Sequence, residues 1–230
     1  MRPEATSDPV DGQDAGAPIP CPACGAPLYG WALVPRRFGP SRVIDRCEEC
    51  GLLVTRTEGP VDVAAELGAL ARGPGEYAAP NRRSVQAGLG GTQWAAIDPT
   101  RRLHLTPRSA TLLLARLDLE VGSIRYPRRG PNLRWMWQTL LNGVTFNLNF
   151  ATELQAGRIR PHGARERIKV AIDVIVTALA GLPAALVAIP LEIASALLRR
   201  GGLMVVEARP RAAGAEEGDP AADPGGGGRI

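Results

Sequence analysis

The sequence of 230 residues predicts an α+β fold in which a small cysteine-rich unit precedes a larger helix-and-strand unit. Two Cys-x-x-Cys pairs near the N-terminus indicate the first unit. A capped, leucine-rich helix followed by an alternating strand, at 106–121, indicates the second unit. A run of 18 residues without charge, 174–191, adds an apolar helical insertion before the last strand. A chain of this length allows one ordinary domain or two small ones.

The composition is that of a folded protein, with 45% hydrophobic residues and a net charge of +4. The basic residues are nearly all arginines, and Lys169 is the only lysine. This small net charge, with no basic cluster interleaved with aromatics, does not favour a nucleic-acid partner, and we expect none. Residues 1–18 contain acids and no apolar core, so they predict a disordered leader rather than a secretory signal. We therefore expect a cytoplasmic protein in a reducing compartment.

Four cysteines form two Cys-x-x-Cys turns that are separated by 22 residues: Cys21, Cys24, Cys47 and Cys50. A glycine follows each turn, at 25 and 51, and lets the backbone fold back toward the sulfurs. Four thiolates in two such turns suit tetrahedral zinc. Residues 19–55 therefore resemble a zinc ribbon, with a β-hairpin between the turns and with Trp31 and Phe38 packed near the metal.

The predicted zinc is structural rather than catalytic, because four protein thiolates leave no open coordination position for a water or a substrate. The alternatives are a redox pair or unliganded thiols. Neither Cys-x-x-Cys turn opens a helix after a strand, as a thioredoxin-like motif would. Arg36 and Arg37 on the predicted hairpin leave a nucleic-acid-binding zinc ribbon as a further alternative.

The second unit begins with a helix cap. Thr106 precedes Pro107, and proline is favoured at the first helical position because its missing N–H needs no partner there. One apolar helix face follows at Ala110, Leu113, Leu114 and Leu117. Beyond it, Leu119 and Val121 alternate with Glu120 and Gly122, as in a strand that is buried on one face. The stretch predicts a helix, a tight turn and a strand.

A longer pattern surrounds this unit, and its matching residues are Pro80, Asn81, Ser84, Gly91, Trp94, Asp98, His104, Thr106, Pro107, Ser109, Leu113 and Leu114. Together with the strand-like "GGLMVVEARP" at 201–210, the pattern resembles the C-terminal part of class I S-adenosylmethionine-dependent methyltransferases. The resemblance implies that 81–210 is a truncated, Rossmann-like methyltransferase remnant. It also implies that strands near 119–126 and 203–208 pair antiparallel.

The half of that family's domain that binds the cofactor has no counterpart here. It should lie between the cysteines and Pro80, where only a connector, 56–80, is present, and one βαβ unit alone takes about 30 residues. The glycines at 88–91 follow no apolar strand, so we interpret them as a loop or helix end. The resemblance implies a structural role for His104, and His162 is expected in a solvated loop. We predict no catalytic and no cofactor-binding residues, and no S-adenosylmethionine binding by the isolated chain.

Because most of the family's sheet is absent, the leucine face of the helix 107–117 needs another cover. The segments 133–148 and 174–198 are the large apolar surfaces that we expect to supply it. Within 131–200, basic residues flank the uncharged run on both sides, which disfavours a simple membrane span. A helical hairpin that turns near Gly181–Pro183 would keep both flanks on one side and dip into one leaflet.

Three interpretations of 131–198 stay open: shallow contact with a membrane surface, a buried core or oligomer interface, and a true span. The favoured function is a non-catalytic, zinc-stabilised, methyltransferase-like protein that contacts a membrane, peripherally at its inner face, or a partner subunit or second copy. One alternative is a methyltransferase of lipids or small molecules whose cofactor half is supplied elsewhere. The predicted organisation is completed by a disordered tail, 211–230.

Overall fold

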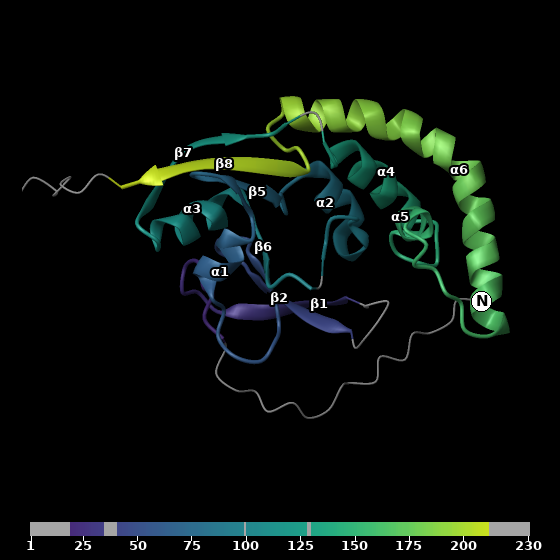
Figure 1. Cartoon of the computed structure of the whole chain (residues 1–230), viewed down its shortest axis with the longest axis horizontal. Helices are drawn as coiled ribbons and strands as arrows, with labels where there is room; N and C mark the ends of the chain where they lie inside the picture. The colour runs from purple at the N-terminus through teal and green to yellow at the C-terminus, as the bar shows by residue number, and fades with distance from the viewer. Residues whose placement is uncertain (1–18, 35–40, 99, 128–129, 212–230) are drawn as a thin grey trace, which may run out of the picture.

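The computed structural model describes residues 19–34, 41–98, 100–127 and 130–211. The predicted leader and all but the first residue of the predicted tail lie outside the described residues, as do Arg36, Arg37 and Phe38. The fold is mixed α+β, as predicted, with two four-stranded antiparallel sheets. Figure 1 shows the first sheet at the bottom of the molecule, the second near the top, and one long helix that runs round the outside.

The elements follow one another with short connections. The strands are β1 (Leu28–Val34), β2 (Arg42–Cys47), β3 (Leu53–Thr55), β4 (Ala71–Gly73), β5 (Glu76–Pro80), β6 (Leu103–His104), β7 (Leu119–Arg125) and β8 (Leu203–Pro210). The helices are α1 (Val63–Gly68), α2 (Val85–Gly90), the 3-10 turn η1 (Gly91–Gln93), α3 (Pro107–Ala115), α4 (Asn132–Asn142), α5 (Phe150–Gln155) and α6 (Ala164–Leu197).

The first sheet joins the cysteine-rich segment to the rest of the chain. Its strand order is β1-β2-β3-β6. The hairpin of β1 and β2 is the one that the sequence predicts between the two cysteine turns. The last strand, β6, comes from beyond residue 100 and pairs with β3 at Leu53 and Val54. The cysteine-rich unit therefore shares its sheet with the segment that leads into α3.

The second sheet has the order β4-β5-β8-β7, with β8 antiparallel to both of its neighbours. The predicted antiparallel pairing of the strands near 119–126 and 203–208 is confirmed, with Ile124 opposite Val206. The segment 56–80, which the sequence suggests is a linker with one short helix at 61–71, contains that helix as α1 and also supplies the strands β4 and β5. Apolar residues at Ala78 and Ala79 fill a central strand there, and a short strand of small residues has a weak sequence signal.

The helix α3 forms as predicted but finds a different cover. Thr106 caps it, Pro107 is its first residue, and Leu113 and Leu114 are fully buried. Their core cluster includes Leu67 of α1, Met204 of β8 and three of the cysteines. The expectation that 133–148 and 174–198 cover this face is therefore wrong. The cysteine turns and the second sheet already fill the space on both sides of α3.

A second core cluster lies between the first sheet and α2. It contains Val34, Ile44, Trp94 and Ile97, and Trp31 packs against it. Trp31 was expected near the cysteines, and this expectation is wrong. Its ring instead lies under the guanidinium of Arg82, 4.9 Å from ring centroid to Cζ, because successive side chains on a strand alternate between the two faces of the sheet.

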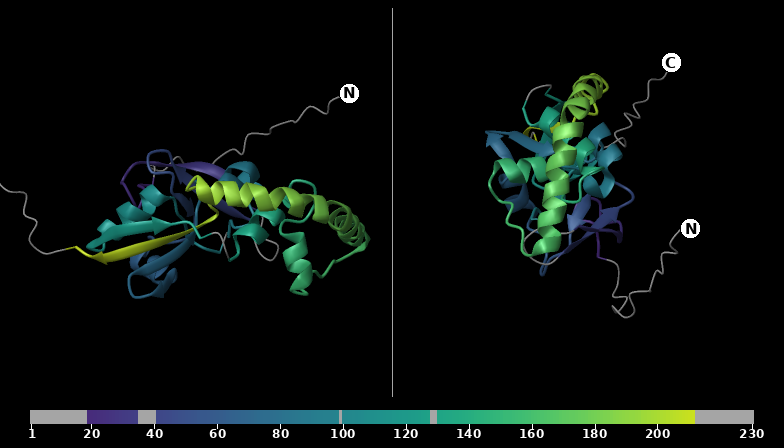
Figure 2. Two further views of the ribbon diagram at one scale, coloured as in Figure 1. Left: turned by 90° about the horizontal axis from the view of Figure 1, so that it is seen from above. Right: turned by 90° about the vertical axis from the view of Figure 1, so that its right-hand side faces the viewer.

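The apolar insertion before β8 is helical, but it is one helix and not a hairpin. α6 continues through Gly181, Pro183 and Pro190 for 34 residues. A proline inside a helix removes one backbone donor and bends the helix without necessarily ending it. Figure 1 shows α6 curving round the molecule, its first part along one edge and its last part over the top, and Figure 2 shows it from above and from the side.

Two buried acids and the helix α4 hold α6 in this shape. Asp173 accepts hydrogen bonds from the backbone N–H groups of Phe146 and Asn147, at 2.7 and 3.0 Å. Glu192 accepts from Gln86 Nε2 and from the backbone N–H of Gly202, at 3.2 and 3.3 Å. α4 packs along the helix between these two points. The body thus ties down the helix at both ends of its apolar stretch, which explains why it does not fold back on itself.

Candidate metal centre and the exposed face of helix α6

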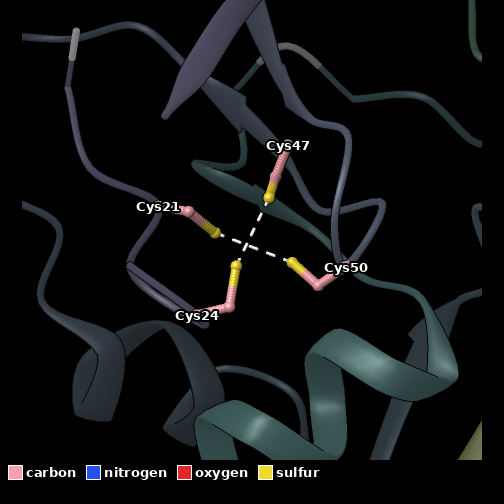
Figure 3. A group of neighbouring side chains, drawn as sticks. All are labelled: Cys21, Cys24, Cys47 and Cys50. Atoms are coloured by element: carbon pink, nitrogen blue, oxygen red, sulfur yellow. Dashed lines mark hydrogen bonds between the residues drawn. The ribbon is translucent and has the colours of Figure 1, made fainter. Parts of the chain in front are cut away.

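The four cysteines that the sequence pairs in two turns come together at one end of the first sheet. The Sγ atoms of Cys21 and Cys50 are 3.6 Å apart, and those of Cys24 and Cys47 are 3.4 Å apart. All four sulfurs lie within 4.8 Å of one another and point at a common centre (Figure 3). No two of them form a disulfide, since all four are free thiols.

The two turns have the same backbone geometry. In each, the N–H of the residue after the second cysteine donates to the carbonyl of the first, Gly25 to Cys21 and Gly51 to Cys47, both at 2.9 Å. The two glycines have φ angles of 79° and 74°, which a residue with a Cβ adopts only at a cost. The backbone N–H of Ala23 donates to Cys21 Sγ at 3.4 Å. Each glycine therefore allows the tight turn that brings two sulfurs to one side.

The sulfur positions fit a tetrahedral metal ion. A Zn–S bond of about 2.3 Å places the sulfurs of a tetrahedral site about 3.8 Å apart, close to the separations in the cluster. Burial raises the pKa of Cys21 and of Cys50. Burial also opposes ionisation of Cys47, but hydrogen bonds from the Cys50 backbone and from Cys24 lower its pKa overall. A cation at the centre would supply the charge that buried thiolates need.

The cluster can hold a metal ion, and its chemistry is that of a closed site. All four donors are sulfurs, three of the four cysteines are buried, and no carboxylate or imidazole joins them among the described residues. Soft thiolate donors suit Zn²⁺ or iron. With four protein ligands, a tetrahedral ion has no position left for a substrate, so the arrangement favours holding the fold together over catalysis.

The two histidines have the settings that were expected for them. His104 is buried in β6, and its Nε2 lies 3.3 Å from Thr55 Oγ1. Because the Thr55 hydroxyl donates to the carbonyl of Arg101, His104 Nε2 carries the hydrogen that bonds back to Thr55. Burial lowers the pKa of His104 to about 4, so the imidazole is neutral. His162 lies exposed in the turn before α6.

The glycine-rich stretch 88–91 is a helix end, as predicted. Gly88 and Gly90 belong to α2, and Gly91 begins the 3-10 turn that follows. The strand β5 leads through residues 81–84 into α2, but the glycines lie at the end of α2 and not in the loop between strand and helix. At the start of α2, the Val85 N–H donates to the backbone carbonyl of Arg200, which lies beyond the end of α6, at 3.1 Å. The stretch therefore lacks the strand–loop–helix setting in which glycines hold a dinucleotide.

The exposed face of α6 is the second feature that needs an explanation. By length and composition α6 is long and apolar enough to cross a membrane, and only 6% of its 18-residue apolar stretch is buried. Eleven of the twenty large hydrophobic side chains that are exposed among the described residues lie on this helix. The interpretation of 174–198 as buried core is therefore wrong, because α4 and α2 cover only one side of it.

Sequence reasoning missed the roles of Asp173 and Glu192, which it treats only as charges at the ends of the uncharged run. Both are at least 97% buried and face the body. A signal was present, since an acid within an otherwise apolar helix must find buried donors or face water. Their partners, which are the 146–147 turn, Gln86 and Gly202, lie outside α6 and are brought to the acids only by the fold. No family model, no curated protein and no solved structure matches the chain.

Proposed function

We propose that this protein is a zinc-stabilised, non-catalytic protein with a methyltransferase-like C-terminal unit, and that it binds a membrane surface through the exposed face of α6. The observation that carries the proposal is the long apolar face that the fold leaves uncovered. Contiguous exposed apolar surface of this extent marks a site of interaction in soluble proteins. The residues at its centre, Leu179 and Leu182, are 73% and 71% exposed.

The shape of α6 favours contact over crossing. Asp173 and Glu192 tie both ends of the apolar stretch to the body. A helix that crossed the bilayer in this arrangement would take α4, which lies against it, into the hydrocarbon as well. The body lies on the concave side of the helix (Figure 1), so the convex side can enter a leaflet while the body stays outside.

The charges at the two ends of α6 favour a lipid surface over a protein partner. Arg165 and Arg167 lie exposed at the start of the helix, and Arg199 and Arg200 lie exposed just after its end. Arginine and lysine near the surface of an anionic leaflet contribute about 1 kcal/mol each. The middle of the face has no charge at all between residues 174 and 191. This pattern matches a bilayer, because the arginines at the two ends can contact the headgroups while the apolar middle contacts the acyl chains.

Zinc and the methyltransferase likeness are supported less directly. The thiolate donors and the two equivalent turns are typical of a zinc ribbon. The antiparallel pair β7 and β8 agrees with the family resemblance at 119–126 and 203–208. Without a cofactor half in the chain, we assign the C-terminal unit a structural role, as the platform that presents α6.

Vesicle binding tests the proposal. The purified full chain is sedimented with vesicles of phosphatidylcholine mixed with phosphatidylglycerol, alongside Leu182→Glu and a control, Leu89→Glu, which changes another exposed leucine, on α2. The wild type and the control should sediment. Leu182→Glu should partition about tenfold less, since a charge in the apolar layer is costly.

Two outcomes would contradict the proposal. One is a wild-type chain that stays in solution with vesicles present. The other is equal sedimentation of the Leu182→Glu and Leu89→Glu variants, because the face would then not be the contact. A soluble wild-type dimer that Leu182→Glu converts to monomer would assign the same face to a second copy instead.

A further inference from the structure

A groove separates α4 from α6 on the side that the two helices share with solvent. Its volume is about 390 Å³, within the range of small-ligand pockets of about 300–1,000 Å³. Its walls are Gly130, Leu133, Arg134, Trp137, Ala185 and Ile189. The groove is therefore apolar along its length and has one charged residue at its wall.

Trp137 and Ala185 shape the groove. The Trp137 indole Nε1 donates to the carbonyl of Gly181 at 2.8 Å, which fixes the ring between the two helices. A Cβ at Gly181 would lie 3.8 Å from the ring, which is an ordinary contact distance, so the hydrogen bond does not require glycine there. Four residues further along α6, Ala185 is too small to fill the space that opens beside the tryptophan. The groove thus lies beside one large residue, Trp137, and one small residue, Ala185, where the two helices meet.

The groove is continuous with the exposed face of α6. Ile189 lines it and is also 45% exposed, and Leu133 on the opposite wall is 42% exposed. A lipid acyl chain that enters the groove from a bilayer would therefore pass from one apolar environment into another. Lipid acyl chains have the length and the apolar character to fill the groove. A polar ligand would lose its hydrogen bonds to water there and find few partners on the apolar walls.

Arg134 is the charged residue at the wall of the groove. Its Nη2 donates to Gln155 Oε1 at 3.0 Å, and no ion pair among the described residues involves it. The guanidinium is therefore held by no carboxylate among the described residues, and it offers further N–H donors at the wall of the groove. A phosphodiester accepts hydrogen bonds from such a fork, which is why arginine is favoured at phosphate sites.

We infer that the groove binds one acyl chain of an anionic phospholipid of the bilayer, with Arg134 on the phosphodiester of the same lipid. The inference rests on the proposed function, since it takes the membrane at α6 as the source of the lipid. It adds to that function a defined lipid position and a preference for anionic headgroups. The site lies between Trp137 on one helix and Ala185 on the other.

Two experiments on the full chain test this inference. In the first, vesicles contain phosphatidylglycerol with bromine near the end of one acyl chain, and the bromine quenches tryptophan fluorescence on contact. Quenching should fall in Trp137→Phe. It should also fall in Ala185→Phe, which fills the groove, but not in Ala194→Phe, which makes the same change at an exposed position elsewhere on α6. Circular dichroism verifies that each variant is folded.

The second experiment measures headgroup preference and needs no repacking of the groove. Arg134→Gln should weaken binding to phosphatidylglycerol vesicles about fivefold and leave the weaker binding to pure phosphatidylcholine unchanged. Arg108→Gln, an exposed arginine on α3 far from α6 in Figure 1, is the control and should bind as the wild type.

The outcomes separate this inference from the function on which it rests. Equal quenching in Ala185→Phe and Ala194→Phe would overturn it, as would equal vesicle affinities of Arg134→Gln and Arg108→Gln. In both cases sedimentation of the wild type with vesicles would leave the membrane function standing. A wild type that binds no vesicles would overturn both.

Discussion

The hydroxyl of Thr106 donates a hydrogen bond to the backbone carbonyl of Cys50 at 2.7 Å, and the same oxygen accepts the N-terminal cap bond of α3 from the Ser109 N–H at 3.0 Å. One side chain thus joins the second cysteine turn to the start of a buried helix. Gly51 makes the approach possible, since a Cβ there would lie 3.1 Å from Thr106 Cγ2. The cysteine cluster and the C-terminal unit are therefore packed as one structure.

Loss of the metal should consequently affect more than the cysteine-rich segment. The purified chain should hold about one zinc, and chelation or Cys47→Ser should lower the melting temperature of the whole chain, because metal binding energy is folding energy in such a site. Thermal unfolding by circular dichroism, with zinc measured by elemental analysis, provides the readout. Glu49→Ser, in the same turn, is the control and should keep the metal. A metal-free protein with an unchanged melting temperature would contradict this prediction.

Thr106→Ala should destabilise the chain by about 1–2 kcal/mol, because it removes both the cap and the bond to Cys50. Thr111→Ala changes an exposed threonine on the same helix and should cost less than about 0.5 kcal/mol. Urea unfolding measures both free energies. If the two variants lose equal stability, Thr106 does not couple the helix to the cysteine turn.

His104 should make the fold sensitive to mild acid. Its pKa is about 4 in the folded chain against 6.5 for the exposed group, so the unfolded chain binds an extra proton between these values. The corresponding stability is fully present above pH 6.5 and is lost as the pH falls toward 4, by about 3 kcal/mol. His104→Gln keeps a side-chain donor but does not titrate, so the free energy of unfolding should depend less on pH across this range. Parallel pH profiles of the variant and the wild type would be evidence against this origin.

The anchoring of α6 depends on a close approach at Gly202. A Cβ at this position would lie 1.6 Å from Gln86 Nε2, and Gln86 is fully buried and bonded to Trp94 and Glu192. Gly202→Ala should therefore cost about 1–3 kcal/mol in unfolding free energy, by urea titration. Gly88→Ala meets no atom within 4 Å in helix α2 and should be neutral or stabilising by up to about 1 kcal/mol. If Gly202→Ala were more stable than Gly88→Ala, Gln86 would have moved aside without a loss of stability.

The isolated chain should not bind S-adenosylmethionine or S-adenosylhomocysteine. The glycines at 88–91 end a helix instead of opening one after a strand. Titration calorimetry is the direct measurement, and heats equal to those of dilution are expected. Binding with a dissociation constant in the low micromolar range, about −8 kcal/mol, would reveal a cofactor site and place the methyltransferase alternative first.

Local pattern determined much of this protein from the sequence alone. The cap and leucine face at 106–114 specified α3, because both signals act within a few residues of one another. The two Cys-x-x-Cys turns likewise specified the cluster, since each turn brings two sulfurs together and only one further contact is needed between the turns. The alternation at 119–121 identified the strand that pairs with β8.

Only the tertiary structure decided which surfaces meet. α1, β8 and the cysteine turns cover Leu113 and Leu114. The sequence does not identify these partners, because hydrophobic burial is non-directional and any apolar segment could cover the two leucines. The continuity of α6 through Pro183 depends on α4 and on two buried acids whose partners are about 10 to 106 residues away. The hydrophobic effect is non-directional, so a sequence states how much surface must be buried and the packed fold determines which face of α6 remains for a membrane.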